Sequence, residues 1–474
     1  MKMKKSILTL FTILCLLFTL PLIGYKTSVK ASPDTIYVPT DYPTIQEAIN
    51  HANSGDTIFV YNGIYYEHVV IDESVSLVGE DRDSTIIDGG GTGSVISVTA
   101  DNVNVNGFTI QNSGPTDSDS GIYVVSSGNN ISHNTITNNK NGIYLYYSSN
   151  NVISDNNAYS NSWYGIHLYY SSNNVISDNN AYSNYNDGIY LYYSNDNTVS
   201  HNNASSNNNG IHLYYSSSNA VYDNNASNND CGIYLHYSND NTVSHNNAST
   251  NNDYGIYLYY SSNNVISDNN AYSNYNDGIY LYYSSNNNMI YHNNFINNIN
   301  QVWSDSVNVW NDDNEGNYWS NYTGQDLNGD GIGDTPYVID ENNQDNRPLM
   351  GMLSDFKVTW KEETHHVTTI CNSTISDFRF EIARETGNKK ISFNVTDGDG
   401  TVGFCRVIIP TELMNYSYIV LVDREEIIST LLDISNKTHA YLYFTYVHSG
   451  HTIAIISSKL LYLYNELLDK YVKL

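Results

Sequence analysis

Alternating apolar and polar positions recur along the middle of the chain and predict short β-strands. In each repeat an Ile and a Leu-like residue stand two positions apart, with Tyr or His between them. This is the spacing of a strand that buries one face, and it differs from the spacing of an amphipathic helix. The repeats begin at Gly121, Gly142, Gly165, Gly188, Gly210, Gly232, Gly255 and Gly278.

The repeat length predicts how these strands are assembled. A second short strand, such as "NVISD" or "NTVSH", follows each first strand, and an Asn pair and a polar turn complete a unit of about 22 residues. One such coil cannot bury its apolar face alone, whereas stacked coils pair in a parallel ladder at a spacing of ~4.8 Å. Leucine-rich repeats have a similar period but require a helix and regular Leu spacing. We therefore predict an all-β chain whose main part is a right-handed parallel β-helix.

Polar columns also follow from stacking the repeats. An Asn recurs at one coil corner, where its amide can bond to the equivalent amides above and below and to the backbone of the turn. Gly begins each strand where a side chain would crowd the bend. The predicted Asn ladder contains Asn156, Asn179, Asn202, Asn224, Asn246, Asn269 and Asn293.

Tyr and His fill two outward columns on the face of the Gly-Ile-(Tyr/His)-Leu strands. Aromatic rings with hydroxyl edges suit the C–H patches and hydroxyls of sugars, which predicts polysaccharide binding. The alternative is that Tyr serves only as a strand former that stacks along the ladder. The predicted glycan contacts are Tyr144, Tyr146, Tyr169, Tyr190, Tyr192, Tyr214, Tyr257, Tyr259, Tyr280 and Tyr282.

Composition shifts along the chain predict its domain organisation. We expect a β-helix with an N-terminal helix cap at residues 34–300, a C-terminal cap at 301–350, and a terminal helix or tail at 459–474. Residues 356–458 alternate apolar and polar positions around Gly-containing turns, which predicts a small antiparallel β-sandwich of immunoglobulin-like size.

The N-terminus and the charge balance indicate an exported protein. Residues 1–31 have the basic start, apolar run and small-residue end of a signal peptide, and no later segment is apolar enough to span a membrane. The formal net charge of −29 argues against a nucleic-acid partner. Nine Asn-X-Ser/Thr sequons are compatible with glycosylation. Outside the cell, Cys371 and Cys405 are expected to form a disulfide, which leaves Cys231 as a lone thiol.

The segment "DLNGDGIGD", residues 326–334, predicts a structural calcium site. Its oxygen-bearing residues occupy positions 1, 3, 5, 7 and 9 of a calcium loop, with Gly331 at the sharp turn. Tyr337 stands where an EF-hand has Glu, so the motif is incomplete, and a turn without metal is the alternative reading. The predicted ligands are Asp326, Asn328, Asp330, Ile332 (through its carbonyl) and Asp334.

A column of alternating His and Asp precedes the Asn ladder. Its members can satisfy one another by hydrogen bonds, or they can hold a transition metal, because imidazole and carboxylate are competent ligands. Asp155 and Asp178 lie in adjacent coils and would be the carboxylate pair if the protein were a glycosidase. The column contains His133, Asp155, Asp178, His201, Asp223, His245, Asp268 and His292.

Two segments carry a family resemblance. "TIYVPTDYPTIQEAINHANSGDTIFV" resembles the start of pectin-lyase-like β-helices, especially pectin methylesterases. The repeats and "GNYWSNYTGQDLNGDGIGDTPYVIDENNQDNRPLM" resemble the NosD-like β-helix family, in forms common on archaeal cell surfaces. The resemblance covers roughly residues 34–350. It implies the β-helix fold and, through the family's copper label, a copper site for which His133, His201, His245 and His292 are the candidates.

Missing residue types argue against catalysis. Residues 101–300 contain one Lys, no Arg and no Glu, whereas lyases and hydrolases of this fold surround their carboxylates with cationic groups. We therefore expect a secreted or cell-surface, non-catalytic protein with an adhesive, polysaccharide-binding or structural role in the cell envelope. Two alternatives stay open: a carbohydrate-active enzyme of the lyase, hydrolase or epimerase type, and a NosD-like copper-binding protein.

Overall fold

The computed structural model describes residues 33–384, 386–415 and 417–458. The predicted signal peptide at 1–31 and the predicted terminal helix at 459–474 lie outside these residues. From Thr35 onward the described chain belongs to one compact unit. Among the described residues, no helix has the length and apolar character needed to cross a membrane.

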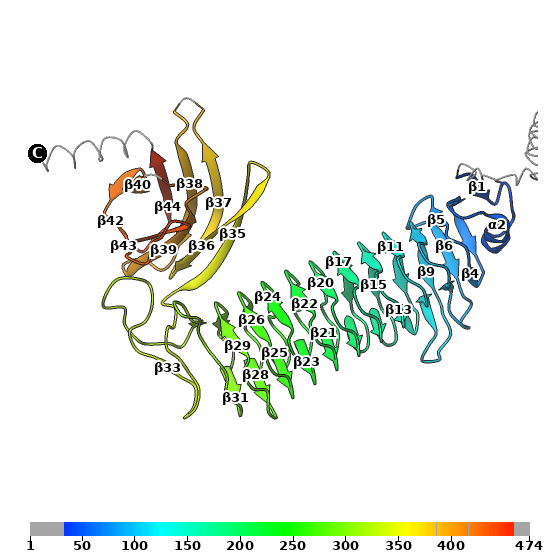
Figure 1. The fold of residues 1–474 in the computed structure, drawn as a ribbon, viewed down its shortest axis with the longest axis horizontal. Helices are drawn as coiled ribbons and strands as arrows, with labels where there is room; N and C mark the ends of the chain where they lie inside the picture. Colours follow the sequence, from blue (N-terminus) through cyan, green and yellow to red (C-terminus); the bar gives the residue numbers. More distant parts are fainter. Residues whose placement is uncertain (1–32, 385, 416, 459–474) are drawn as a thin grey trace, which may run out of the picture. The chain divides into compact units, whose positions relative to one another are not determined.

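Most coils of the β-helix contribute three strands, which stack into three parallel sheets (Figure 1). The predicted right-handed parallel β-helix is confirmed. Sheet C is built from the Gly-Ile-(Tyr/His)-Leu strands. It contains β4 (Val69–Ile71), β7 (Ile96–Val98), β10 (Ser120–Val124), β13 (Asn141–Tyr146), β16 (Ile166–Tyr169), β19 (Ile189–Tyr192), β21 (Asn209–Tyr214), β23 (Cys231–His236), β25 (Tyr254–Tyr259), β28 (Asp277–Tyr282) and β31 (Asn300–Ser304).

The other two sheets complete the coil. Sheet A contains β1 (Thr35–Val38), β2 (Thr57–Val60), β5 (Ser76–Gly79), β8 (Asn104–Asn106), β11 (Asn130–Ser132), β14 (Val152–Ser154), β17 (Val175–Ser177), β20 (Thr198–Ser200), β22 (Ala220–Tyr222), β24 (Thr242–Ser244), β26 (Val265–Ser267) and β29 (Met289–Tyr291). Sheet B contains β3 (Gly63–Tyr65), β6 (Thr85–Asp88), β9 (Thr109–Gln111), β12 (Thr135–Thr137), β15 (Asn157–Tyr159), β18 (Asn180–Tyr182), β27 (Asn270–Tyr272), β30 (Asn294–Ile296) and β32 (Tyr318–Trp319). Single bridges at Asn203, Asn225 and Asn247 connect its two parts.

The core is a set of apolar columns that run from coil to coil. On sheet C, Ile166 pairs with Ile189 and Leu168 pairs with Leu191, and all four side chains are fully buried. Because each Ile or Leu lies directly above its equivalent in the next coil, every repeat closes the core of its neighbours.

The predicted Asn ladder is present and continuous. The amide of Asn179 donates to Asn202 Oδ1 at 3.0 Å and to the Ile153 carbonyl at 2.8 Å, while its oxygen accepts from Asn156. Two further Asn ladders occupy the other corners. One contains Asn129, Asn151, Asn174, Asn197, Asn219, Asn241, Asn264, Asn288 and Asn308, and the other Asn139, Asn161, Asn184, Asn207, Asn229, Asn251, Asn274 and Asn298.

Glycine at the start of the repeat strands of sheet C is required by the close approach of successive coils. A Cβ on Gly210 would lie 2.6 Å from the carbonyl oxygen of Gly232. Real Cβ atoms do not approach backbone oxygens this closely, so any other residue would push the coils apart at this corner.

Both ends of the β-helix are covered. At the N-terminal end, α2 (Ile45–His51) begins at the cap Thr44, whose side chain accepts from the Glu47 backbone, and buries Ile45, Ala48 and Ile49 in the core. At the other end, β31 pairs with β28 and β32 with β30, so the ladders extend past residue 300, where the β-helix was predicted to end. Trp310 and Trp319 close the core there, beside the hairpin of β33 (Tyr337–Val338) and β34 (Gln344–Asp345).

The C-terminal part contains two five-stranded antiparallel sheets, as predicted for a β-sandwich. One sheet contains β35 (Met352–Trp360), β36 (Glu363–Cys371), β39 (Val402–Pro410), β42 (Ser429–Leu431) and β43 (His439–Val447). The other contains β37 (Thr374–Ile382), β38 (Lys389–Thr396), β40 (Ser417–Val422), β41 (Glu425–Ile427) and β44 (His451–Ser458). Val367, Phe393, Phe444 and Ile455 belong to the core that they share.

Candidate functional site

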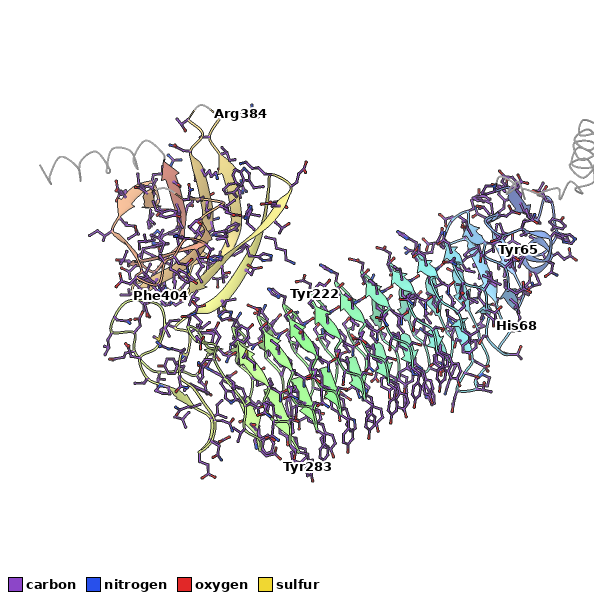
Figure 2. The ribbon with its side chains drawn as sticks, viewed as in Figure 1. Tyr65, His68, Tyr222, Tyr283, Arg384 and Phe404 are labelled. Atoms are coloured by element: carbon purple, nitrogen blue, oxygen red, sulfur yellow. The ribbon has the colours of Figure 1, made fainter. Side chains whose placement is uncertain are left out.

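The outer surface of sheet C carries three columns of aromatic side chains, which we call the aromatic face. The sequence predicted two of them. The first column contains Tyr123, Tyr144, His167, Tyr190, His212, Tyr234, Tyr257, Tyr280 and Trp303, and the second contains Tyr146, Tyr169, Tyr192, Tyr214, His236, Tyr259 and Tyr282. The third, the corner tyrosines, contains Tyr147, Tyr170, Tyr193, Tyr215, Tyr237, Tyr260 and Tyr283. Figure 2 shows Tyr283 pointing away from the coils.

Part of the first column is buried, which corrects the predicted set of glycan contacts. Tyr144 and Tyr190 are only 7% and 9% exposed, and the Tyr164 ring stacks on Tyr190 with 4.8 Å between ring centroids. His167 is stacked between Tyr144 and Tyr190, and burial lowers its pKa to about 3, so it is neutral. Tyr144 and Tyr190 therefore offer little surface to a polymer, and the Tyr164 ring that covers Tyr190 is not part of the repeat pattern.

The second column and the corner tyrosines form the accessible part of the aromatic face. Tyr146 stacks on Tyr169 at 5.3 Å, and Tyr169 stacks on Tyr192 at 5.0 Å. Five of the seven rings also meet the neighbouring corner tyrosine edge to face, as Tyr169 meets Tyr170 at 4.8 Å. Because neighbouring rings cover most ring faces, this surface presents mainly ring edges and hydroxyls.

The border of the aromatic face is acidic. Asp187 is buried and lies 3.0 Å from His212 Nδ1. Asp277 opens strand β28, and burial raises its pKa to about 6. Lys140 is the one Lys of residues 101–300, and its Nζ lies 3.7 Å from the centroid of the Trp163 ring. Such a border repels an acidic polymer and is compatible with a neutral one.

The His/Asp column lies at the corner between sheets A and B, where its residues have positive φ. His133 and Asp155 are 4.0 Å apart, and His201 and Asp223 are 3.3 Å apart. Within the described residues, no group of three or more His, Cys, Asp or Glu side chains is placed to hold a metal ion. His133, His201, His245 and His292 stand in separate coils with at least one coil between them, so they do not fit a shared copper site.

The predicted carboxylate pair lies on this corner as well. Asp155 and Asp178 are both exposed at left-handed corners in adjacent coils, and Asp155 faces His133. Among the described residues, neither carboxylate forms an ion pair with a Lys or Arg side chain. The structure therefore brings the two carboxylates to one surface without the charged setting of a hydrolase site.

The column ends in a buried ion cluster that joins the β-helix to the β-sandwich. His292 lies 3.1 Å from Glu315 and 3.6 Å from Asp268, and Arg406 of β39 pairs with Glu315 from the other side. Burial alone lowers the pKa of His292, but the hydrogen bonds and charges of Asp268 and Glu315 outweigh it and raise the pKa to about 10. His292 is therefore charged at neutral pH.

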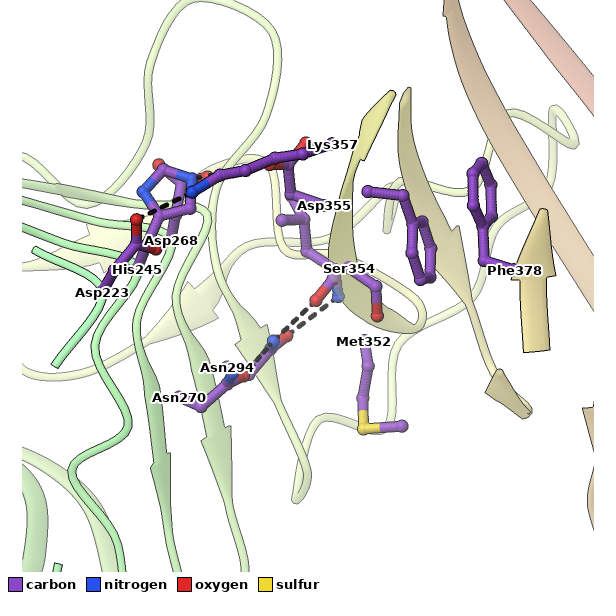
Figure 3. Close-up of a pocket in the computed structure, with 12 residues that line it drawn as sticks. Asp223, His245, Asp268, Asn270, Asn294, Met352, Ser354, Asp355, Lys357 and Phe378 are labelled. Atoms are coloured by element: carbon purple, nitrogen blue, oxygen red, sulfur yellow. Dashed lines mark hydrogen bonds and ion pairs between the residues drawn. The ribbon is translucent and has the colours of Figure 1, made fainter. Parts of the chain in front are cut away.

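A cleft of about 570 Å³ lies beside this cluster, where β35 passes the last coils (Figure 3). Lys357 Nζ is 2.7 Å from Asp223 Oδ2. The Asn294 side chain bonds to both the N–H and the carbonyl of Leu353, at 2.9 and 2.8 Å. These contacts bind the first strand of the sandwich to the β-helix; they join residues 59 and 134 positions apart in the chain, so the repeat pattern could not predict them.

The predicted calcium loop is organised around Asp326. Its carboxylate accepts the backbone N–H groups of Gly329, Asp330 and Gly331 at 2.7 to 3.1 Å. Asp330 accepts the N–H of Ile332, and Asp334 accepts the N–H of Leu327. An all-oxygen donor set of this kind suits calcium, with Asp326, Asn328, Asp330, the Ile332 carbonyl and Asp334 as the residues that would hold it. Calcium binding stays a prediction.

The two predicted disulfide partners face each other. Cys371 of β36 and Cys405 of β39 are register partners in adjacent strands, both fully buried and present as thiols. The Tyr446 hydroxyl lies 3.4 Å from Cys371 Sγ. Disulfide formation between them stays a prediction.

These features define a right-handed parallel β-helix with an extended aromatic face and a C-terminal β-sandwich. The family model described as "Periplasmic copper-binding protein (NosD)" matches residues 49–230 and 180–324, which together exceed half of the chain. The chain therefore belongs to the NosD family.

Solved structures with a similar fold include polysaccharide-acting proteins. The mannuronan C-5 epimerase AlgE6 A-module of Azotobacter vinelandii has a TM-score of 0.49 and 18% identity over 58% of this chain and 88% of that one. The Dettilon tailspike protein has a TM-score of 0.46 and 14% identity over 89% and 93%. An alginate lyase from Paenibacillus sp. has a TM-score of 0.36 and 15% identity over 60% and 97%. Likeness of this degree says nothing about activity. No curated protein matches the chain.

Proposed function

We propose that this protein is a secreted, non-catalytic β-helix of the cell envelope that binds a neutral polysaccharide along its aromatic face. The observation that carries the proposal is the second column together with the corner tyrosines, which line up ring edges and hydroxyls coil after coil. An extended sugar chain lying along the helix axis would meet the same donors and acceptors at every step. Tyr combines a large contact area with a polar tip, which suits such a ligand.

Electrostatics supports a neutral rather than an acidic polymer. The chain carries a formal net charge of −29, and buried or half-buried Asp187, Asp253 and Asp277 border the aromatic face. An anionic polymer would have to approach these carboxylates without compensating cations, which disfavours the complex. The copper binding named for the family is not part of this proposal, because the four candidate histidines face carboxylates in separate coils.

The test is co-sedimentation of the purified protein with insoluble polysaccharides, with reducing ends measured in the supernatant. We expect retention on a neutral β-glucan or mannan, little retention on calcium alginate, and no release of reducing ends. Tyr169→Ala with Tyr192→Ala should weaken retention about 10-fold or more, as expected for losing two aromatic contacts. The matched control is Tyr159→Ala with Tyr182→Ala, a stacked pair on sheet B with 5.0 Å between rings.

Two results would overturn the proposal. Retention unaffected by the sheet C double variant would place the ligand elsewhere. Release of reducing ends, abolished by Asp155→Asn or Asp178→Asn, would make the protein an enzyme.

A further inference from the structure

The corner tyrosines occupy a backbone conformation that does not favour them. Tyr147, Tyr170, Tyr193, Tyr215, Tyr237, Tyr260 and Tyr283 all have φ between 46° and 49°. Bulky residues rarely adopt this left-handed region, because it crowds the side chain against the backbone. Gly or Asn would relieve the strain.

The other left-handed corners of the same coils show that Tyr is not needed to make the turn. Those corners carry short or polar side chains, such as Asn173, Ser183, Ser206 and Asp240. At the corner after sheet C, the seven coils from β13 to β28 carry Tyr, and none of them has Phe, which would stack equally well. The phenol group is therefore the feature that this position retains.

The corner tyrosines also form the most regular ring stack of the molecule. Neighbouring centroids are 4.7 to 5.3 Å apart, and neighbouring rings are within 9° of parallel. The parallel stacking brings each phenol ring next to the equivalent ring of the following coil. Tyr147, Tyr170, Tyr215 and Tyr283 are 36% to 59% exposed, so a dissolved oxidant reaches the hydroxyl and ortho positions.

We propose that the corner tyrosines are a site of oxidative cross-linking, in which rings of successive coils join as dityrosine. The co-reactant is hydrogen peroxide used by a haem peroxidase, which removes one electron at a time. Each of two neighbouring phenols loses one electron and its hydroxyl proton to give a phenoxyl radical. The radicals join through their ortho carbons, and the two ortho hydrogens move to the oxygens and restore the phenols. Overall the pair loses two electrons and two protons, and the peroxide is reduced to two waters.

The cross-link would change the mechanics of the β-helix. Each bond would close a loop of one coil, 22 or 23 residues long, and add a covalent link at a corner where backbone hydrogen bonds and ring stacking already join the two coils. This inference is independent of polysaccharide binding, because it depends on ring geometry and access of the oxidant alone.

Oxidation of the dilute full-length protein with a peroxidase and hydrogen peroxide tests the proposal, with cross-linked peptides mapped by mass spectrometry. We expect dityrosine within single molecules between neighbours such as Tyr170–Tyr193 and Tyr193–Tyr215. Tyr193→Phe preserves stacking and should remove both of these cross-links while Tyr237–Tyr260 remains.

The controls are tyrosines that are more exposed but unstacked. Tyr66, Tyr185 and Tyr275 are 75%, 78% and 69% exposed, and the structure gives them no ring partner. If exposure alone governed the reaction, these three would be the most cross-linked. Cross-links mainly at these positions, cross-links only between molecules, or no dityrosine in the corner column would each overturn the proposal.

Discussion

His292 Nε2 lies 3.1 Å from Glu315 Oε2, at the point where the His/Asp column of the β-helix meets the cap. Arg406 reaches the same carboxylate from the β-sandwich. One buried glutamate is thus shared by two cations from different parts of the chain. Because burial makes each of these charges costly when unpaired, the three groups depend on one another.

The pH dependence of stability should report this cluster. The pKa of His292 is about 10 in the folded protein, above its ordinary value near 6.5, so folding favours the protonated form. Its contribution is complete below about pH 6.5 and is lost as the pH rises through about 10. We expect the urea unfolding midpoint to fall across this range. In His292→Gln the fall should be smaller, and stability at neutral pH should drop by about 3 kcal/mol.

The variant Asp345→Asn checks that the loss of stability above neutral pH belongs to His292. Asp345 is also buried, and burial raises its pKa to about 6, so its contribution is lost at a lower pH, as the pH rises through about 6. Asp345→Asn should leave the change above neutral pH intact. An unaltered alkaline profile in His292→Gln would contradict the role given to His292.

The Asn ladder should resist substitution more than its neighbours. Asn179 is 1% exposed, and its loss removes the acceptor of the Asn156 backbone N–H and side-chain amide and a donor to the Ile153 carbonyl. Asn179→Ala should therefore destabilise the protein by about 3 kcal/mol. The control is Asn180→Ala, one residue later and exposed, with a single side-chain bond to Asn157. We expect its cost to be below about 1 kcal/mol. Chemical denaturation of both variants measures the difference.

Calcium binding by residues 326–334 can be separated from the loop's own hydrogen bonds. Asp330→Asn and Asp334→Asn keep an oxygen acceptor for the N–H groups of Ile332 and Leu327 but remove the charges that calcium requires. We expect calcium to raise the thermal unfolding midpoint of the unaltered protein and EDTA to reverse the rise. The double variant should show neither effect. A calcium response in the double variant, or none in the unaltered protein, contradicts a site in this loop.

The cysteines of β36 and β39 should oxidise as a pair. Cys371 and Cys405 are register partners, so bond formation requires no rearrangement of the strands. After unfolding without reductant, we expect an alkylating reagent to label Cys231 and to leave the other two unlabelled. Reduction should expose both. Labelling of all three described cysteines before reduction would show that the disulfide does not form.

The residue columns that recur once in every coil could be predicted from the sequence, because each coil meets the same neighbours. The Ile, Leu, Asn and Gly columns recur because stacking presents each coil with the same neighbours, so the period alone places them. The third aromatic column was present as the doublet "YY" in nearly every repeat. It escaped prediction because strand alternation assigns the second Tyr to the core face, whereas its positive φ turns it outward.

Features that depend on the ends of repeats or on distant contacts could not be predicted. Tyr190 is covered by the ring of Tyr164, a loop residue with no equivalent in most coils. The Lys357–Asp223 and Arg406–Glu315 pairs join the sandwich to the β-helix across long sequence separations. The repeat pattern of the sequence contains no information about these long-range contacts.

Each coil contacts only its nearest neighbours. The length of the aromatic face can therefore change by one whole coil at a time. Recombination between near-identical repeats would add or delete one coil while leaving α2 and the Trp310–Trp319 end unchanged. Each event would lengthen or shorten the row of hydroxyls by ~4.8 Å without creating a new corner or core packing. The number of coils, and with it the length of the aromatic face, can therefore change in evolution while the fold stays the same.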